Sequence, residues 1–226
     1  DPRAGLRSLT ALLRLREEYR FALDLQLCAF AQEGLTQEPE TLTLLRQALE
    51  MGADLVGGLD PCAFDRDPQR HLDIIFELAC RHNKKIDIHL HERGELGAFS
   101  LELILAFIRR YQKQNAVTIS HGFCLGMLEP DRQQRFAEEM AALGVSVATT
   151  APADIAVPPW ELLDSVGVAI CAGNDGVRDT WSPYGNGDMI QRAVTMGLRY
   201  RWRKDSEISR AARSVTHGGA RVMALE

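Results

Sequence analysis

The stretch Lys85-Ile86-Asp87-Ile88-His89-Leu90-His91-Glu92 decides the fold class of this chain. Residues 85–90 form a β-rich run that is too short to be a helix of its own. Such a run is typical of a strand that is buried on both faces of a parallel sheet. The stretch therefore predicts a buried strand with ionisable side chains at its carboxyl end.

Similar runs recur along the chain, and their starts lie about 23 to 32 residues apart. They cover residues 21–30, 53–59, 116–120, 144–150 and 167–173. Amphipathic helical patterns alternate with them at about 40–51, 68–83, 97–113, 130–143 and 159–165. Gly52, Gly144 and Gly167 follow three of these patterns, as is common where a helix ends. Strand alternating with helix predicts βα units and a parallel sheet.

Two architectures are built from such units, a doubly wound sheet and a (β/α)8 barrel. The Gly-rich turn that a doubly wound nucleotide fold carries after its first strand is missing from the sequence. Polar residues instead follow several strands, namely Gln32-Glu33, Asp60, His89-x-His91-Glu92, His121, Thr149-Thr150 and Asn174-Asp175. Reactive side chains at the carboxyl ends of several strands favour a TIM-type barrel whose loops build one site.

The number of repeats is lower than a closed barrel needs. About six units are present, and the sequence opens on a helical pattern at 6–19 with no strand before it. We therefore expect one domain over residues 1–226 that holds the third to eighth strands of a barrel and lacks its amino-terminal strands. Three helical stretches after the last strand, about 186–202, 205–213 and 215–225, are expected to close the base of the barrel.

Composition excludes several other classes of protein. Among the 226 residues, 46% are hydrophobic and 25% are charged, which is ordinary for a globular protein. The net charge of −5 comes without a basic stripe, so a nucleic-acid partner is not expected. Apolar runs are too short to span a membrane, and the first residues do not read as a signal peptide. Five scattered cysteines predict reduced, mostly buried thiols in a cytoplasmic protein.

Three motifs at strand ends carry the chemistry. His89 and His91 alternate along a strand and would share one face, and His121 and Asp175 end two later strands. Imidazole nitrogens and a carboxylate are suitable ligands for a divalent metal, and the nearby Glu92 is suited to carrying protons. The alternatives are exposed polar residues at a strand end, a hydrogen-bonded histidine at 121 and an Asx turn at Asp175. Taken together, the set is similar to a hydrolytic metal site.

The same motifs, in the same order, resemble those of the amidohydrolase superfamily. They are His89-x-x-Glu92, Ser120-His121, Asp175 and Asp179-Thr180-Trp181-Ser182-Pro183-Tyr184-Gly185, together with Gln32 in Ala29-Phe30-Ala31-Gln32-Glu33-Gly34. The resemblance extends over essentially the whole chain. Within the superfamily it is closest to bacterial cytosine deaminase and related heterocycle deaminases and amidohydrolases.

The resemblance implies one divalent metal ion, Zn²⁺ or Fe²⁺, at the mouth of the barrel. It assigns His89 and Asp175 as metal ligands and expects two further histidine ligands from a first strand absent from this sequence. It gives Glu92, His121 and Asp175 catalytic roles. Glu92 would protonate a ring nitrogen, and His121 would orient the attacking hydroxide. Gln32 would read the amide face of a substrate, and Trp181 would help to cover the pocket.

Departures from the cytosine deaminase pattern bear on the substrate. Gly176 stands in the place of a second aspartate, Asn174 in the place of a histidine, and His91 in the place of an aspartate before Glu92. The sequence therefore leaves open a substrate other than cytosine, such as a triazine or a cyclic ureide. His91 either faces that substrate or lies outside the pocket. The sequence accordingly predicts a metal-dependent hydrolase or deaminase that acts on a C–N bond of a small heterocycle.

Alternatives to that function remain at this point. A barrel remnant without a full set of metal ligands could be a non-catalytic binding or assembly protein, and a sheet with missing strands leaves a homo-oligomer open. A sugar- or phosphate-handling barrel is less consistent, because no Gly-rich phosphate loop follows the last strands. Two further histidines, His71 and His82, are expected on the surface of a helix, without a role.

Overall fold

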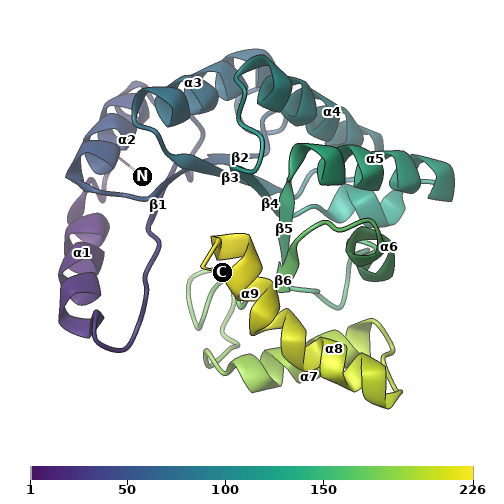
Figure 1. The fold of residues 1–226 in the computed structure, drawn as a ribbon. Coiled ribbons are helices and arrows are strands. Elements are labelled where there is room, and N and C mark those ends of the chain that lie inside the picture. The colour runs from purple at the N-terminus through teal and green to yellow at the C-terminus, as the bar shows by residue number, and fades with distance from the viewer. Residues whose placement is uncertain (1, 226) are drawn as a thin grey trace.

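The computed structural model describes residues 2–225 and contains one six-stranded parallel sheet. Its strands lie in chain order, and each pairs with the next in parallel register. They are β1 (Cys28–Phe30), β2 (Leu55–Leu59), β3 (Lys85–Leu90), β4 (Val117–His121), β5 (Ser146–Thr149) and β6 (Ile170–Ala172). Figure 1 shows that the strands follow an arc, with helices along its outer side. The predicted α/β fold with parallel βα units is confirmed.

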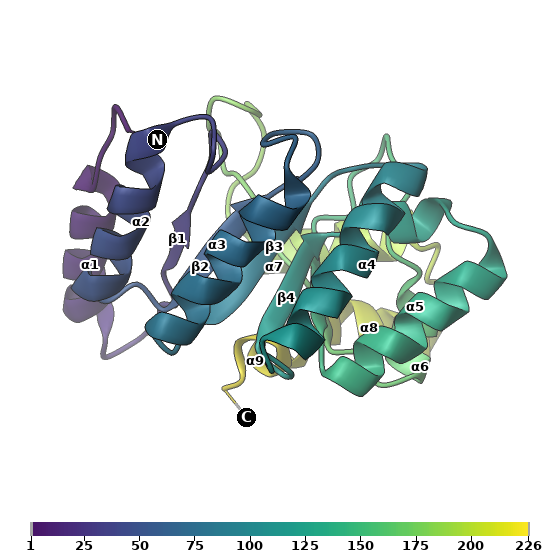
Figure 2. The ribbon, with the colours of Figure 1, turned by 90° about the horizontal axis from the view of Figure 1, so that it is seen from above.

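The outer layer consists of a first helix, which precedes β1, and of the helices that connect successive strands. They are α1 (Arg7–Tyr19), α2 (Pro39–Met51), α3 (Pro68–Arg81), α4 (Gly94–Arg110), the 3₁₀ helix η1 (Phe123–Met127), α5 (Pro130–Leu143) and α6 (Trp160–Ser165). Seen from above, α2 to α5 follow one another across the sheet in chain order (Figure 2). Left-handed glycines at Gly52 and Gly144 end α2 and α5, as their sequence positions predict.

Strand β3 shows how the sequence sorts side chains between the two faces of the sheet. Ile86, Ile88 and Leu90 have no exposed surface and belong to the core shared with the outer helices. Asp87 and His89, which alternate with them, are half-buried and therefore occupy the opposite, inner face of the arc. The strand thus places His89 on the side where the barrel mouth is expected.

The last three helices, α7 (Met189–Arg199), α8 (Asp205–Ser214) and α9 (His217–Met223), follow β6. Lys85 at the amino end of β3 and Gln26 before β1 both donate to the carbonyl oxygen of Met223, at 3.3 and 2.8 Å. Helix α9 therefore lies at the amino ends of the strands, as expected for an element that closes the base (Figure 1).

A cluster of aromatic rings joins α6 to the end of α7. Trp202 packs on Trp160 and Tyr200 with ring centroids 5.5 and 5.0 Å apart, and its indole nitrogen donates to Glu161 at 2.5 Å. Trp160 and Trp202 are both buried. The contacts fix the C-terminal helices to the rest of the molecule.

Three expectations need correction. The run 21–30 forms a strand only over Cys28–Phe30, because its first residues lie at the surface, where Phe21 and Leu23 are 83% and 54% exposed. All five cysteines are free, but Cys28 and Cys80 are exposed and only two of the five are fully buried. His71 is completely buried, since it pairs with a carboxylate inside the protein.

No helix within residues 2–225 combines the length and apolar character needed to cross a membrane.

Candidate metal centre and substrate pocket

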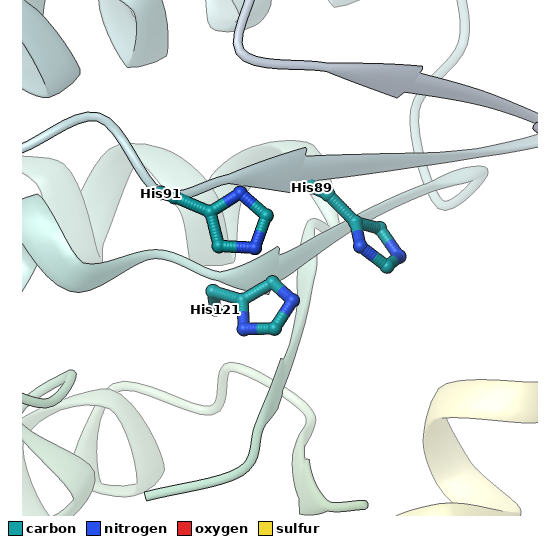
Figure 3. Close-up of side chains that lie close together, drawn as sticks. All are labelled: His89, His91 and His121. Carbon is teal, nitrogen blue, oxygen red and sulfur yellow. The ribbon is translucent and has the colours of Figure 1, made fainter. Parts of the chain in front are cut away.

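Three histidine rings meet at the carboxyl ends of β3 and β4. His89 lies in β3, His91 directly follows that strand, and His121 ends β4, where it is in register with Leu90. One ring nitrogen from each histidine lies within 4.8 Å of those of the other two. Figure 3 shows the rings facing one another, two from one chain segment and one from the neighbouring strand. The cluster therefore results from the parallel register of two strands.

Two of the rings, those of His89 and His121, lie in surroundings that favour their neutral forms. Burial lowers the pKa of His89, although the nearby charge of Asp87 opposes the shift. Burial lowers the pKa of His121 to about 3, and the neighbouring rings of His91 and His89 add to the effect. Neutral imidazoles keep a nitrogen lone pair that can bind a metal. The buried Nδ1 atom of His121 has no hydrogen-bond partner. This donor set fits a divalent cation with nitrogen ligands.

Asp60, the residue after β2, holds His91 in place. Its carboxylate accepts the backbone N–H of His91 at 2.6 Å and lies 2.9 Å from the Nδ1 atom of that ring. It also accepts the backbone N–H of Glu92 at 3.0 Å. With Nδ1 engaged, the other ring nitrogen, Nε2, is left for a ligand. The sequence places Asp60 among the polar residues that follow strands, but that position alone did not indicate a role.

The carboxylate of Glu92 is buried and is engaged by another loop. One oxygen accepts the backbone N–H groups of Cys62 and Ala63, at 2.9 and 2.8 Å, and the other accepts the hydroxyl of Ser100. Glu92 therefore ties the β2–α3 loop to the start of α4. Glu92 follows His91 in the chain and so lies next to the histidine cluster. Its side chain, however, contacts the β2–α3 loop.

A cavity of about 570 Å³ lies at the same end of the sheet, beside the loop that follows β6. Gln32, Asn174, Asp175 and Trp181 all line it. The charge of Asp175 raises the pKa of His89 and so partly opposes the effect of burial. No oxygen of Asp175 falls within the 4.8 Å group of histidine nitrogens in the part of the chain that the structure describes. Asp175 therefore lies close enough to His89 to act on its charge, but it is not a member of the histidine group.

Two of the three sequence departures, Asn174 and Gly176, lie in this loop, and the structure gives a local reason for Gly176. A Cβ atom on Gly176 would collide with the carboxylate of Asp179, which fills the space that a side chain would take. Asp179 in turn accepts the backbone N–H groups of Trp181 and Ser182, at 2.9 and 3.0 Å. The Trp181 ring, 74% exposed, therefore stands on a turn that Asp179 shapes.

Arg192 of α7 also lines the cavity, and sequence reasoning missed it because nothing in a helical pattern distinguishes it. Its guanidinium donates to the side-chain oxygen of Asn174 at 3.2 Å and to the carbonyl oxygen of Thr150 at 2.7 Å. Burial lowers the pKa of Arg192, while the charge of Asp175 opposes the shift. The residue therefore links the loops after β5 and β6 at the pocket wall.

A curved sheet of parallel βα units, with imidazole and carboxylate groups gathered at the carboxyl ends of its strands, is the arrangement of a TIM-type barrel that carries its site at that end. The chain belongs to the amidohydrolase family, whose model matches residues 2–226. The resemblance to heterocycle deaminases and amidohydrolases that the motifs indicated is confirmed.

Individual relatives agree with the family. The crystal structure of N-isopropylammelide isopropylaminohydrolase from Burkholderia multivorans ATCC 17616 is 46% identical with a TM-score of 0.98, over 100% of this chain and 58% of that chain. That of 5-methylcytosine deaminase from Klebsiella pneumoniae, liganded with phosphonocytosine, is 26% identical with a TM-score of 0.85, over 98% and 57%. N-isopropylammelide isopropyl amidohydrolase of Pseudomonas sp. (strain ADP) is 30% identical over 230 residues, 100% of this chain and 56% of the relative. The chain spans about half the length of the curated relatives it matches.

Proposed function

We propose that the protein is a metal-dependent hydrolase that cleaves a C–N bond on a small nitrogen heterocycle, cytosine-like or triazine-like. The observation that carries the proposal is the histidine cluster at the same end of the sheet as a cavity lined by Asp175, whose charge acts on His89. Family membership supports hydrolysis, and the names of the relatives support a heterocyclic substrate. The similarity to two N-isopropylammelide hydrolases favours a ring that carries an alkylamino group.

His89 and Asp175 would hold the metal ion, Zn²⁺ or Fe²⁺, together with two histidines of a further strand. Such a cation supplies, when bound, a Lewis acid that makes water a nucleophile near neutral pH. The neutral state of His89 suits this role, because a protonated imidazole cannot bind a cation. We assign residues 1–226 to one barrel domain of this kind.

The other residues would bind the ring and move protons. His121 would orient the attacking water and stabilise the negative charge that develops on the substrate. Glu92 would release the loop that it now contacts and protonate a ring nitrogen, while Asp175 would accept the proton of the attacking water. A C–O bond forms, and Asp175 would pass the proton it accepted to the exocyclic nitrogen. The C–N bond then breaks, that nitrogen leaves as ammonia or an amine, and the new hydroxyl returns a proton to Glu92 as the C=O bond forms.

Gln32, His91 and Trp181 would decide which ring is accepted. A glutamine amide is both donor and acceptor and matches a ring edge where N–H adjoins C=O. His91, held by Asp60, would present Nε2 to the substrate, and Trp181 would cover the ring. We further propose a cytoplasmic location, because five free thiols suit a reducing compartment. Neither a nucleic-acid nor a membrane partner forms part of the proposal.

The test measures metal content and turnover of the full-length gene product. Ammonia and alkylamine release is followed on a panel of aminopyrimidines and alkylamino-triazines. We expect bound Zn or Fe in the wild type, its loss in His89→Ala together with turnover, and retention of both in His82→Ala, which removes an imidazole outside the cluster. Absence of both metal and turnover across the panel would contradict the proposal and support a non-catalytic binding or assembly protein.

A further inference from the structure

A buried histidine–aspartate pair lies outside the candidate metal centre, between the β2–α3 loop and the first turn of α3. The Oδ2 atom of Asp65 is 2.5 Å from the Nδ1 atom of His71, and neither side chain has any exposed surface. Two ionisable groups are costly to bury unless hydrogen bonds satisfy them. The contacts of Asp65 therefore indicate what the pair holds.

The carboxylate of Asp65 binds the loop that follows β1. It accepts the backbone N–H of Leu35 at 2.9 Å and both the backbone N–H and the hydroxyl of Thr36, at 2.9 and 3.0 Å. The side chain of Gln37 adds a bond to the backbone carbonyl oxygen of Asp65 at 3.3 Å. Three consecutive residues of one strand-end loop are thus fixed by a single residue of the next loop.

The segment held in this way is the end of the turn that carries Gln32. The N–H of Gly34 donates to the carbonyl oxygen of Ala31 at 3.1 Å, so Gln32 and Glu33 are the central residues of a β-turn. Gly34 has a φ of +84°, and a Cβ atom there would lie 2.7 Å from Oδ1 of Asp65. Strand β1 fixes the turn on one side and Asp65 fixes it on the other. Gln32 then lines the cavity.

The structural role of His71 is to hold the carboxylate of Asp65. Its Nε2 atom is buried without a hydrogen-bond partner. Gly58 of β2 gives the ring its space, because a Cβ atom at that position would lie 2.6 Å from Nε2. Burial on its own would raise the pKa of Asp65, but the hydrogen bonds from His71, Thr36 and Leu35 lower it to about 2. The carboxylate therefore stays ionised and remains a strong acceptor at neutral pH.

We propose that Asp65 and His71 are positioning residues that fix the Gln32 turn and thereby set the selectivity of the pocket for a ring with an amide edge. The inference rests on the proposed function for its link to the substrate. Displacement of a substrate-binding group by about 1 Å can cost roughly 100-fold in rate. Loss of a buried polar match also reduces discrimination between substrates.

The kinetic test is a double-mutant cycle in the full-length protein. Asp65→Asn is expected to lower kcat/KM by about 10- to 100-fold for a ring with an amide edge, and less for an analogue without that edge. If Asp65 acts through Gln32, then adding Asp65→Asn to Gln32→Ala has no further effect beyond about twofold. Effects that multiply in the double variant would overturn the positioning role.

Asp67→Asn is the matched control, because it makes the same change two residues away. Asp67 accepts the backbone N–H of Arg70 at 3.1 Å and caps α3, a task that asparagine also performs. We expect wild-type kinetics for this control. Thr36→Val, which removes one contact to Asp65, is expected to act in the same direction as Asp65→Asn but more weakly. If Asp65→Asn does not fold, Thr36→Val replaces it in the kinetic test.

Hydrogen exchange tests the contact between Asp65 and residues 35–36, here called the clamp, separately from activity. Exchange of the Leu35 and Thr36 amides is expected to rise at least tenfold in Asp65→Asn, or to a smaller extent in Thr36→Val, while the core of α3 keeps its rate. Unchanged exchange at both amides would overturn the clamp. A wild type without turnover would instead contradict the proposed function. The exchange rates of Leu35 and Thr36 would then be the only test of whether Asp65 holds this segment.

Discussion

His121 is the residue whose surroundings make the protein most sensitive to mild acid. The folded state holds its pKa near 3, below the usual value of 6.5, because the ring is buried and lies beside two other imidazoles. Between these two values the unfolded chain binds the proton more readily than the folded chain does. Protonation then favours unfolding, so the free energy of unfolding falls as the pH drops from 6.5 towards 3.

The prediction concerns the metal-free protein with His121 replaced by asparagine. A single such group changes the free energy of unfolding by at most about 1.4 kcal/mol per pH unit. Urea denaturation between pH 5 and 7 should give a flatter pH dependence for His121→Asn than for the wild type. Part of the slope should remain, because burial also lowers the pKa of His89. Identical slopes in the two proteins would contradict the prediction.

Individual residues also show where sequence reasoning succeeded and where it stopped. Alternation along residues 85–92 placed His89 and His91 on one face, because strand geometry leaves no other choice. His71 was misplaced, since a helical pattern reveals polarity but not a buried carboxylate partner from six residues earlier. The contacts of Glu92 with residues 62 and 63 were equally out of reach, because they depend on how two separate loops meet.

At the scale of elements, the start of α4 is packed so closely that only glycine fits. A Cβ atom on Gly97 would collide with the carbonyl oxygen of Glu92 and would lie 2.6 Å from the Cβ atom of Cys124 in η1. We expect Gly97→Ala to lower the free energy of unfolding by about 1–3 kcal/mol, as overpacked cores do. Chemical denaturation measures the loss.

Gly219 in α9 provides the matched control for that substitution. No atom lies within 4 Å of the position that its Cβ would occupy. Gly219→Ala is therefore expected to be neutral or to stabilise the helix by up to about 1 kcal/mol. Equal losses for the two variants would mean that the close approach of α4 to η1 does not govern stability.

Elements were predicted from the sequence more reliably than their bounds. Buried runs such as residues 116–120 became strands because both faces of the sheet are covered along them. The run 21–30 contains enough apolar residues for a strand, but residues 21–24 are exposed and the run stays irregular up to residue 27. Hydrophobicity identifies candidate strands, whereas tertiary contacts decide how much of each one pairs.

The whole molecule has an open sheet. Within residues 2–225, β1 and β6 each pair on one side only, which leaves an unsatisfied edge at both ends of the arc (Figure 1). Unpaired strand edges are templates for association with other chains. Residues 1–226 expressed alone are therefore expected to self-associate as their concentration rises. Light scattering coupled to size-exclusion chromatography measures this, with the full-length gene product as the comparison. A monomer of constant mass at every concentration would contradict the expectation.

The unequal exposure of the three tryptophans gives the protein an internal optical reporter. Trp160 and Trp202 are shielded within the aromatic cluster, whereas Trp181 stands in solvent at the rim of the cavity. Acrylamide should quench the emission of Trp181 first, and a ring compound stacked on that indole should protect it. Fluorescence can thus follow occupancy of the cavity and detachment of the C-terminal helices as two separate signals in one sample.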